Sequence, residues 1–396
     1  MSDQPRDDET PRDPTSRNLT RRSLLTGGAG AVLGAAAVGG LSLLGGRGAG
    51  APSSTTTPGE ADATPVAAMG DHQAGVAAPA VPPVNAEIGV FDAPDITGPA
   101  ALRDLLATLG DRIVQLTAAD HRSRLLPDGP GDLTLTVGIG ARLLSFVGTD
   151  LATAATLPTF AGDADLESSG GDVLLVAAAS DPSIPPGALS ALADGLEARW
   201  QQPAFRGARK GGATRNPFGY YDGIIAPHTE SDLDAGVWIA DGPLAGGTIC
   251  TVRRFRLDIA RFQALGDGAQ DAVFGRRQSD GQPLSGGDAF GEIDLTAKSA
   301  EGEYLVPARA HARAAHPSFI GAPLMLRRSY SYANAADDRG IVFLSFQNDV
   351  STFARTLRRM EEVDDLLPFT TATASGAFAV LPGFSSDRPL GATLSV

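Results

Sequence analysis

Three segments of the sequence carry side chains that suit one kind of chemistry. The first, Asn216-Pro-Phe-Gly-Tyr-Tyr-Asp-Gly223, places a carboxylate in a turn bracketed by glycines. About ninety residues later comes His311-Ala-Arg-Ala-Ala-His-Pro317, and shortly after it Leu324-Met-Leu-Arg-Arg-Ser-Tyr-Ser-Tyr332. With a carboxylate, an imidazole and an arginine, an enzyme can transfer a proton, bind a metal and stabilise negative charge that develops during a reaction.

Each of these features also has an ordinary explanation. Asp-Gly pairs commonly form simple turns, a lone histidine is more often a surface or core residue than a ligand, and paired arginines usually face solvent. A histidine ligand must come from His72, His121, His228, His311 and His316. Composition alone leaves His311 and His316 both open. If Arg327 and Arg328 lie on a strand, they point to opposite faces, so only one can enter a common pocket.

Apolar runs and alternations predict the elements that would position these segments. Strands are predicted at 132–138, 172–177, 248–258, 324–332 and 340–346, and helices at 99–112, 187–199 and 351–367. Strands and helices therefore mix through both halves of the chain, which indicates two α+β units. The predicted organisation is a leader over 1–51, a linker over 52–70, and units at 71–228 and 229–396, with order beginning near residue 71.

Composition is that of an ordinary globular protein, and 396 residues are enough for two core-bearing units. The net charge of −14 argues against a nucleic-acid partner, whose phosphates would be repelled. The single cysteine, Cys250, excludes an intramolecular disulfide and a cysteine-rich metal cluster. It lies in the apolar run Thr248-Ile-Cys-Thr-Val252 and is predicted to be a buried structural thiol.

The first fifty or so residues have the pattern of an export signal. A polar stretch leads to Thr20-Arg-Arg-Ser-Leu-Leu25, and an uncharged run rich in Gly, Ala and Leu follows up to Gly46. Paired arginines before a mildly apolar stretch predict a twin-arginine signal, cleaved near residues 49–51, and a periplasmic or extracellular destination. The alternative is a membrane anchor, because the run is long enough to span, although its many glycines make it weakly hydrophobic.

Taken together, the segments resemble the dye-decolourising peroxidase family. The run from Gly219 to Gly223 matches the family's Gly-x-x-Asp-Gly motif. The run from His311 to Pro317 matches its His-x-Arg-x-Ala-Asn-Pro, with His316 where the family usually has Asn. Weaker matches follow in family order at 72–76, 138–142, 245–248, 252–256, 274–277, 279–284 and 377–383. The similarity is greatest to the exported subgroup that includes the deferrochelatases.

The resemblance implies an α+β fold of two ferredoxin-like units, each an antiparallel sheet with peripheral helices. It implies one haem b per chain, with His311 as the ligand of the iron and with Asp222 and Arg327 as the catalytic residues. Cofactor contacts are expected from Gly223, Ile224, Ile225, His311, Arg313, His316, Pro317, Ser318 and Arg327. An apolar wall is expected from Ile341, Val342, Phe343 and Phe346. Arg328 is expected to face away or to meet a haem propionate.

The reaction implied is that of a haem-dependent peroxidase. Hydrogen peroxide would give a ferryl haem with a porphyrin radical, which oxidises dyes, phenolics or similar organic donors by one-electron steps. Six aromatic residues are candidates to relay electrons: Trp200, Trp238, Tyr220, Tyr221, Tyr330 and Tyr332. Tyr220 and Tyr221 come first because they are closest in sequence to Asp222, although ordinary packing explains most such aromatic residues. One alternative is an exported haem- or iron-handling protein with partners in an iron-uptake system, and another is a catalytically silent binding module. Self-association into a homo-oligomer is also compatible with the resemblance.

Overall fold

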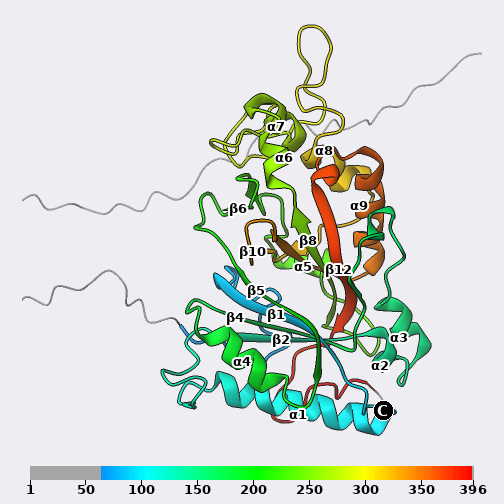
Figure 1. Ribbon diagram of the computed structural model, residues 1–396. Coiled ribbons are helices and arrows are strands. Elements are labelled where there is room, and N and C mark those ends of the chain that lie inside the picture. The colour runs from blue at the N-terminus through cyan, green and yellow to red at the C-terminus, as the bar shows by residue number, and fades with distance from the viewer. Residues whose placement is uncertain (1–63, 395–396) are drawn as a thin grey trace, which may run out of the picture. The chain divides into compact units, whose positions relative to one another are not determined.

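The sheet that carries the fold is antiparallel along its whole path. In the computed structural model, which describes residues 64–394, this path is β10-β5-β1-β4-β2-β12-β8-β11-β9 (Figure 1). The first half of the chain supplies β1 Asn85–Asp92, β2 Thr134–Ile139, β4 Val173–Ala179 and β5 Glu197–Phe205. The second half supplies β8 Thr248–Leu257, β9 Leu326–Arg327, β10 Tyr330–Ala333, β11 Arg339–Gln347 and β12 Thr370–Val380. The short β3 Ser168–Ser169 lies off this path, parallel to β12.

The two halves of this sheet share one apolar core between their inner faces. They join at narrow seams, where β2 meets β12 through Gly138 and Ile139 and β10 meets β5 through Ser331. Because β10 also pairs with β11, the path closes on itself. The shared core draws on both halves, and includes Val90, Val176, Cys250, Val252, Val342 and Phe378. Each half therefore has an outer face that is left for helices to cover.

Two helices close the outer face of the first half. These are α1 Pro99–Thr117, which begins with a proline at a position where no helical hydrogen bond is lost, and α4 Ile184–Leu192 (Figure 1). The spacing of Leu102, Leu106, Leu109 and Ile113 puts these side chains on one face of α1, and each is at most 1% exposed. They pack with the outward residues of β2 and β4 in a single filled cluster.

The outer face of the second half is covered by more scattered elements. They are the one-turn α8 His311–Ala314, α9 Val350–Val363, α6 Ile259–Gln263 and α7 Asp267–Phe274. Elsewhere lie α2 Ala141–Leu144, α3 Thr149–Ala154 and α5 Glu230–Gly236, and the 3-10 turns Ala161–Asp163, Pro317–Phe319 and Leu367–Phe369. A short hairpin of β6 Thr214–Arg215 and β7 Tyr221–Asp222 joins the two halves of the chain.

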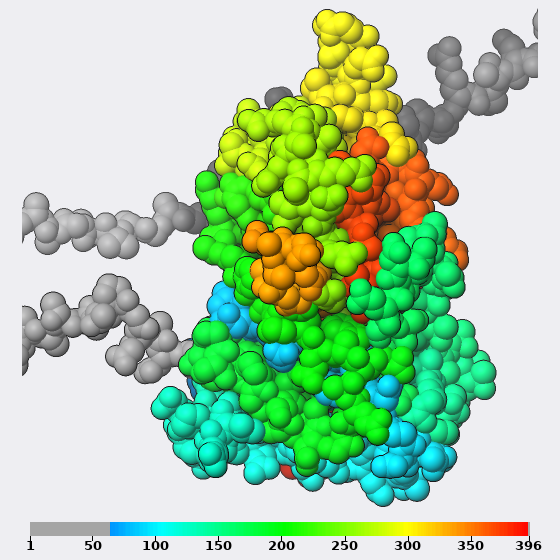
Figure 2. Space-filling view, viewed as in Figure 1, coloured from blue at the N-terminus to red at the C-terminus, as the bar shows by residue number. Residues whose placement is uncertain are grey.

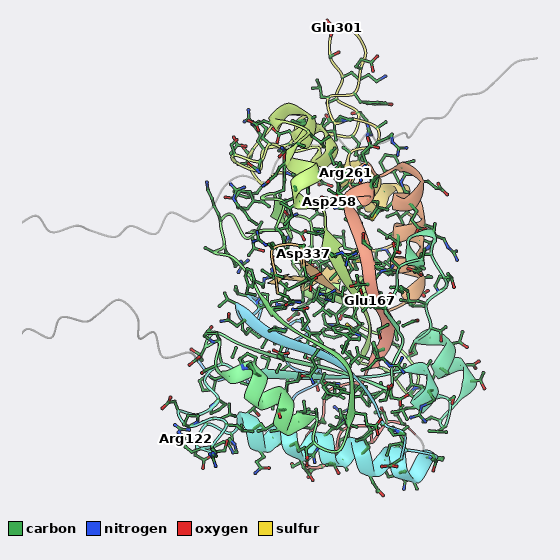
Figure 3. All side chains as sticks on the ribbon, in the orientation of Figure 1. Arg122, Glu167, Asp258, Arg261, Glu301 and Asp337 are labelled. Atoms are coloured by element: carbon green, nitrogen blue, oxygen red, sulfur yellow. The ribbon has the colours of Figure 1, made fainter. Side chains whose placement is uncertain are left out.

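One irregular segment, residues 292–306, projects beyond the helices of the second half (Figure 2), and Glu301 marks its tip (Figure 3). Arg313 ties down its base. The guanidinium donates two hydrogen bonds to the carbonyl oxygen of Leu295, at 2.9 and 2.6 Å, and lies over the ring of Tyr304. Arg313, two residues after His311, thus binds this projecting segment to α8.

The predicted fold class is confirmed, because the described chain mixes helices with antiparallel sheets. The strands predicted at 132–138, 172–177, 248–258 and 340–346 are present as β2, β4, β8 and β11. Cys250 is fully buried, and burial raises the pKa of its thiol above the ordinary value, as expected for a structural cysteine.

The helix predicted at 99–112 is present as α1 but extends to Thr117, and three other predicted elements are also wrong in their extent. The helix predicted at 187–199 ends at Leu192, because Gly195 turns the chain with a φ of +84° and β5 then begins. The strand predicted at 324–332 is interrupted after Arg327 and forms β9 and β10. The helix predicted to reach residue 367 ends at Val363, where the next residue is already extended.

The predicted leader over 1–51, and most of the linker, lie outside the described residues. Between residues 64 and 394, no helix combines the length and the apolar character needed to cross a membrane. The predicted boundary between residues 228 and 229 falls in the connection between β7 and α5.

Candidate active site

A cavity lies between the outer face of the second half of the sheet and the elements that cover it. Its apolar lining includes Phe255, Leu257, Ile341 and Phe343 from the sheet, and Phe274, Phe353, Leu357 and Met360 from α7 and α9. Its charged and titratable lining is Tyr221, Asp222, Arg276, His311, His316 and Arg327. A mostly apolar cavity with a few convergent polar groups is the usual form of a site for an organic ligand or cofactor.

The strand β11 contributes only half of the apolar wall expected from it. Ile341 and Phe343 line the cavity, whereas Val342 and Phe346 lie in the core between the two halves of the sheet. This corrects the expectation, and the reason is the two-residue period of a strand, which sends odd and even positions of β11 to opposite faces.

His311 begins α8, and Asp364 fixes the orientation of its ring. The Nδ1 atom lies 2.7 Å from Oδ2 of Asp364, whose side chain is fully buried. Burial disfavours the charged imidazole, but the charge of Asp364 and its hydrogen bond outweigh burial, and the pKa of His311 is raised. Because Nδ1 is held, Nε2 on the other side of the ring is left for a ligand in the cavity. Metal-binding histidines are commonly oriented in this way by a carboxylate.

His316 also lines the cavity, but both of its nitrogens are engaged. Its Nδ1 accepts a hydrogen bond from the backbone N–H of Ser318 at 3.2 Å, and its Nε2 lies 3.3 Å from Oε1 of Glu292. Of the two histidines that composition left open, His311 is therefore the one with a nitrogen available to a metal.

The hairpin of β6 and β7 presents Asp222 to the cavity, and β9 presents Arg327. Oδ1 of Asp222 accepts a hydrogen bond from the N–H of Gly223 at 2.6 Å, and Nη2 of Arg327 lies 3.8 Å from the same oxygen. Nη2 of Arg327 also donates to the carbonyl oxygen of Ile225 at 3.0 Å. The side chain of Asp222 is 41% exposed and that of Arg327 is 26% exposed, so both reach the open space of the cavity. The arrangement offers a proton carrier beside a fixed positive charge.

The backbone after Asp222 also lines the cavity. Gly223 has a φ of +84°, which other residues rarely adopt, and a Cβ built on it would meet no atom within 4 Å. The conformation of the turn, rather than crowding, thus requires glycine here. Ile224 and Ile225 continue along the same wall, and Pro317 lies on the wall after α8.

Two of the expected cofactor contacts lie elsewhere among the described residues. Arg313 and Ser318 do not line the cavity. Arg313 is two positions after His311, and two positions turn a helical side chain by about 200°, so it points to the projecting segment instead. Arg328 is buried on the opposite side of the strand from Arg327, as expected, and donates to the carbonyl oxygen of Ala77 at 2.9 Å. Burial lowers the pKa of Arg328 to about 10.

Several groups of the site could not be found from the motifs. Asp364 lies 53 residues beyond His311 and belongs to no recognisable pattern around it. The α9 residues Phe353, Leu357 and Met360 belong to a helix that the sequence predicted, but the sequence did not predict the cavity that this helix covers. Arg276, which is buried in the cavity wall, carried no signal beyond its place in a weak match.

The donor set of this cavity fits a haem. A bare metal ion in a protein needs several side-chain ligands, whereas a haem iron needs one axial ligand and an apolar cleft for the macrocycle. His311 offers one imidazole nitrogen, the rings and methyl groups of β8, β11 and α9 offer apolar walls, and Asp222 and Arg327 stand in the same space.

Comparison with known proteins agrees with this geometry. The model of the N-terminal part of Dyp-type peroxidases matches residues 73–205, and the model of their C-terminal part matches residues 213–385. A dye-decolorizing peroxidase from Thermobifida fusca is 33% identical over 292 residues, which cover 67% of this chain and 68% of the relative.

Solved structures give the same result. A DyP-type peroxidase from Streptomyces coelicolor superposes with a TM-score of 0.75 at 30% identity, over 85% of this chain and 98% of that one. The oxyferrous complex of DtpA from Streptomyces lividans superposes with a TM-score of 0.76 at 30% identity, over 84% of this chain and 98% of that one. The chain therefore belongs to the Dyp-type peroxidase family and is a haem peroxidase.

Proposed function

We propose that this peroxidase binds haem b in the cavity with His311 as the iron ligand, and uses hydrogen peroxide to oxidise dyes, phenolics or similar organic donors one electron at a time. One observation carries the proposal: α8, β7 and β9 bring His311, Asp222 and Arg327 into one apolar cavity. The haem, when bound, supplies the redox chemistry with peroxide. Gly223, Ile224, Ile225, His316 and Pro317 would contact it, because they share the cavity wall.

The side chains of the chain itself have distinct tasks in this reaction. Asp222 takes a proton from hydrogen peroxide, directly or through a water, and returns it to the oxygen that leaves as water. Arg327 stabilises the negative charge that develops as the O–O bond breaks, and its hydrogen bond to the carbonyl oxygen of Ile225 holds it in place. Asp364 holds the ring of His311, so that Nε2 is left free toward the cavity, where it would bind the haem iron.

Substitution of Asp222 tests the proposal directly. In Asp222→Asn, the side chain keeps its size but cannot carry the proton, so we expect haem binding to persist and turnover with peroxide to fall by about 10² to 10⁴. Asp337→Asn is the matched control, because Asp337 lies in the exposed turn between β10 and β11 (Figure 3). Steady-state peroxide consumption and the Soret band are the readouts. Equal turnover in Asp222→Asn and the wild type would remove Asp222 from the mechanism.

The finer features of the proposal rest on the sequence. Export by the twin-arginine route predicts that Arg21→Lys with Arg22→Lys keeps the protein in the cytoplasm, which cell fractionation would measure.

Self-association into a homo-oligomer is tested by light scattering of the purified protein. The relatives named above are peroxidases, which favours peroxidase activity over an iron-handling role with iron-uptake partners.

A further inference from the structure

The cavity holds most of the methionine of the described chain. Between residues 64 and 394 there are three methionines, Met69, Met325 and Met360, and the last two line the cavity. A thioether is a soft and easily oxidised group, which oxidants such as hydrogen peroxide convert to a sulfoxide. The cavity of this peroxidase thus contains two side chains that its own oxidising substrate can modify.

Met325 lies on the same wall of the cavity as Arg327. It precedes Arg327 by two residues, and Leu326 between them packs in the core between the two halves of the sheet. Side chains alternate along an extended chain, so Met325 and Arg327 both face the cavity, with Cα atoms about 7 Å apart. Nη2 of Arg327 in turn lies 3.8 Å from Oδ1 of Asp222. The thioether of Met325 is therefore on the side of the cavity where peroxide is expected to react.

Met360 lies on the His311 side of the cavity. The N–H of Asp364 donates to the carbonyl oxygen of Met360 at 2.8 Å, and Asp364 holds Nδ1 of His311. A planar cofactor bound to Nε2 of His311 would stand between this side of the cavity and Asp222. It would cover Met360 and leave Met325 open to peroxide.

We propose that Met325 is a site of oxidative modification, at which peroxide bound beside Asp222 and Arg327 transfers an oxygen atom to the thioether sulfur. The inference rests on the proposed function, because that function brings peroxide to this site. A lone pair of the sulfur forms the S–O bond as the O–O bond breaks. Asp222 moves a proton to the leaving oxygen, which departs as water, and Arg327 stabilises its negative charge. The sulfur loses two electrons, peroxide gains them, and no other reactant is needed.

The modification would change the wall of the cavity. Met325 is 8% exposed and packs in an apolar cluster with Phe160, Phe353 and Leu357. A sulfoxide places a polar oxygen in this cluster, and burying a polar group without a partner is costly. Phe353 and Leu357 belong to α9 and also line the cavity. Oxidation of Met325 therefore loosens α9 over the cavity, and we expect haem to be released when peroxide is present without an organic donor.

Exposure to solvent alone predicts the opposite order of oxidation. Met69 is 45% exposed, Met360 is partly exposed and Met325 is 8% exposed. Peroxide acting from bulk solvent would therefore oxidise Met69 first and Met325 last. Oxidation directed by Asp222 and Arg327 requires Met325 to come first, so the order of oxidation separates the two causes.

Peptide mass spectrometry of the haem-loaded protein, treated with peroxide in the absence of a donor, measures that order. We expect the sulfoxide to form at least about tenfold faster at Met325 than at Met69, and Asp222→Asn to remove this lead because the proton carrier is gone. Met325→Leu keeps an apolar side chain of similar volume, and should retain the Soret band after a dose of peroxide that releases haem from the wild type. Met360→Leu is the matched control and should lose its haem as the wild type does.

The same samples distinguish failure of this inference from failure of the proposed function. Oxidation that begins at Met69 or Met360, in a protein that binds haem and consumes peroxide, overturns the inference and leaves the proposed function standing. An equal lead of Met325 in Asp222→Asn, or loss of haem from Met325→Leu at the same dose as from the wild type, also overturns the inference. A wild-type protein that takes up no haem overturns both.

Discussion

The outer faces of the two halves of the sheet are covered in different ways. On the first half, the 19-residue α1 and the nine-residue α4 lie along the strands, and their side chains fill the space against β2 and β4. On the second half, His311 sits on a four-residue helix, and the chain between α7 and β9 is mostly irregular. On this half even the 14-residue α9 covers the cavity without filling it, since Phe353, Leu357 and Met360 line the open space. The first half shows how this chain builds a core, and the second shows how it leaves room for a ligand.

The strongest test of the cavity on the second half is removal of the imidazole of His311. In His311→Ala, the iron would lose its protein ligand, and we expect haem affinity to fall by more than the about ten- to hundredfold that loss of an outer-shell partner costs. The Soret band, followed as haem is titrated into the protein, measures this loss. His316→Ala is the comparison: His316 also lines the cavity, but both of its nitrogens are already engaged, so we expect a clearly smaller loss of haem affinity. A Soret band that survives in His311→Ala but not in His316→Ala would exchange the roles of the two histidines.

Two leucines, one from each half, test whether the first half is packed more completely than the second. Leu109 of α1 is 0% exposed in the filled layer, whereas Leu357 of α9 is 6% exposed and faces the cavity. We expect Leu109→Ala to lower the free energy of unfolding by about 3 kcal/mol, because it opens a new void in a packed layer. Leu357→Ala should cost clearly less, since one side of Leu357 already lacks packing partners. Urea denaturation of the haem-free protein measures both values, and equal costs would contradict the contrast.

A smaller effect is expected one step behind His311, the proposed iron ligand. Asp364→Asn keeps a hydrogen-bond acceptor near Nδ1 of His311 but removes the charge that raises the pKa of this histidine. We expect haem affinity to fall by about ten- to hundredfold. Asp365→Asn is a close control, because Asp365 pairs with Arg309 on the surface and not with His311. Equal affinity in the two variants would show that Asp364 has no part in holding the ligand.

The two faces were not equally open to prediction from the sequence. The filled face follows from local patterns: helical spacing of leucines in α1, and continuous apolar runs in β2 and β4. The hollow face depends on contacts between distant segments. The motifs named Asp222, His311 and Arg327. The contact of Asp364 with His311 and the stacking of Tyr220 on Phe274 depend instead on tertiary packing, which no local spacing encodes.

Departures from the predicted site have the same origin. Arg313 fell inside the motif that begins at His311, yet the turn of a single-turn helix sends it to the carbonyl oxygen of Leu295. Val342 and Phe346 belong to the right strand but to its other face. A motif therefore predicts which residues come close along the chain, while the three-dimensional packing decides which of them reach the cavity.

The smallest expected effect concerns a buried carboxyl group in the first half of the sheet. Glu87 of β1 is 8% exposed and lies on the same strand face as Phe91, which packs in the filled layer. Burial raises its pKa from 4.5 to about 7. Below pH 4.5, folded and unfolded states are both protonated, and no stability is lost. As the pH rises toward 7, the unfolded state ionises while the folded state keeps its proton, so stability falls, and above pH 7 the loss is complete.

Glu87→Gln should remove this pH dependence, because an amide cannot ionise. One pKa unit corresponds to about 1.4 kcal/mol, and with partial relaxation of the site we expect the variant to gain at most about 2 kcal/mol over the wild type between pH 5 and pH 8. Urea unfolding of both proteins at the two pH values measures the difference. Glu197→Gln is the control, since Glu197 is exposed at the start of β5. A constant difference between Glu87→Gln and the wild type would mean that Glu87 ionises in the folded layer as readily as in the unfolded chain, and the first half would then be less tightly closed than its packing indicates.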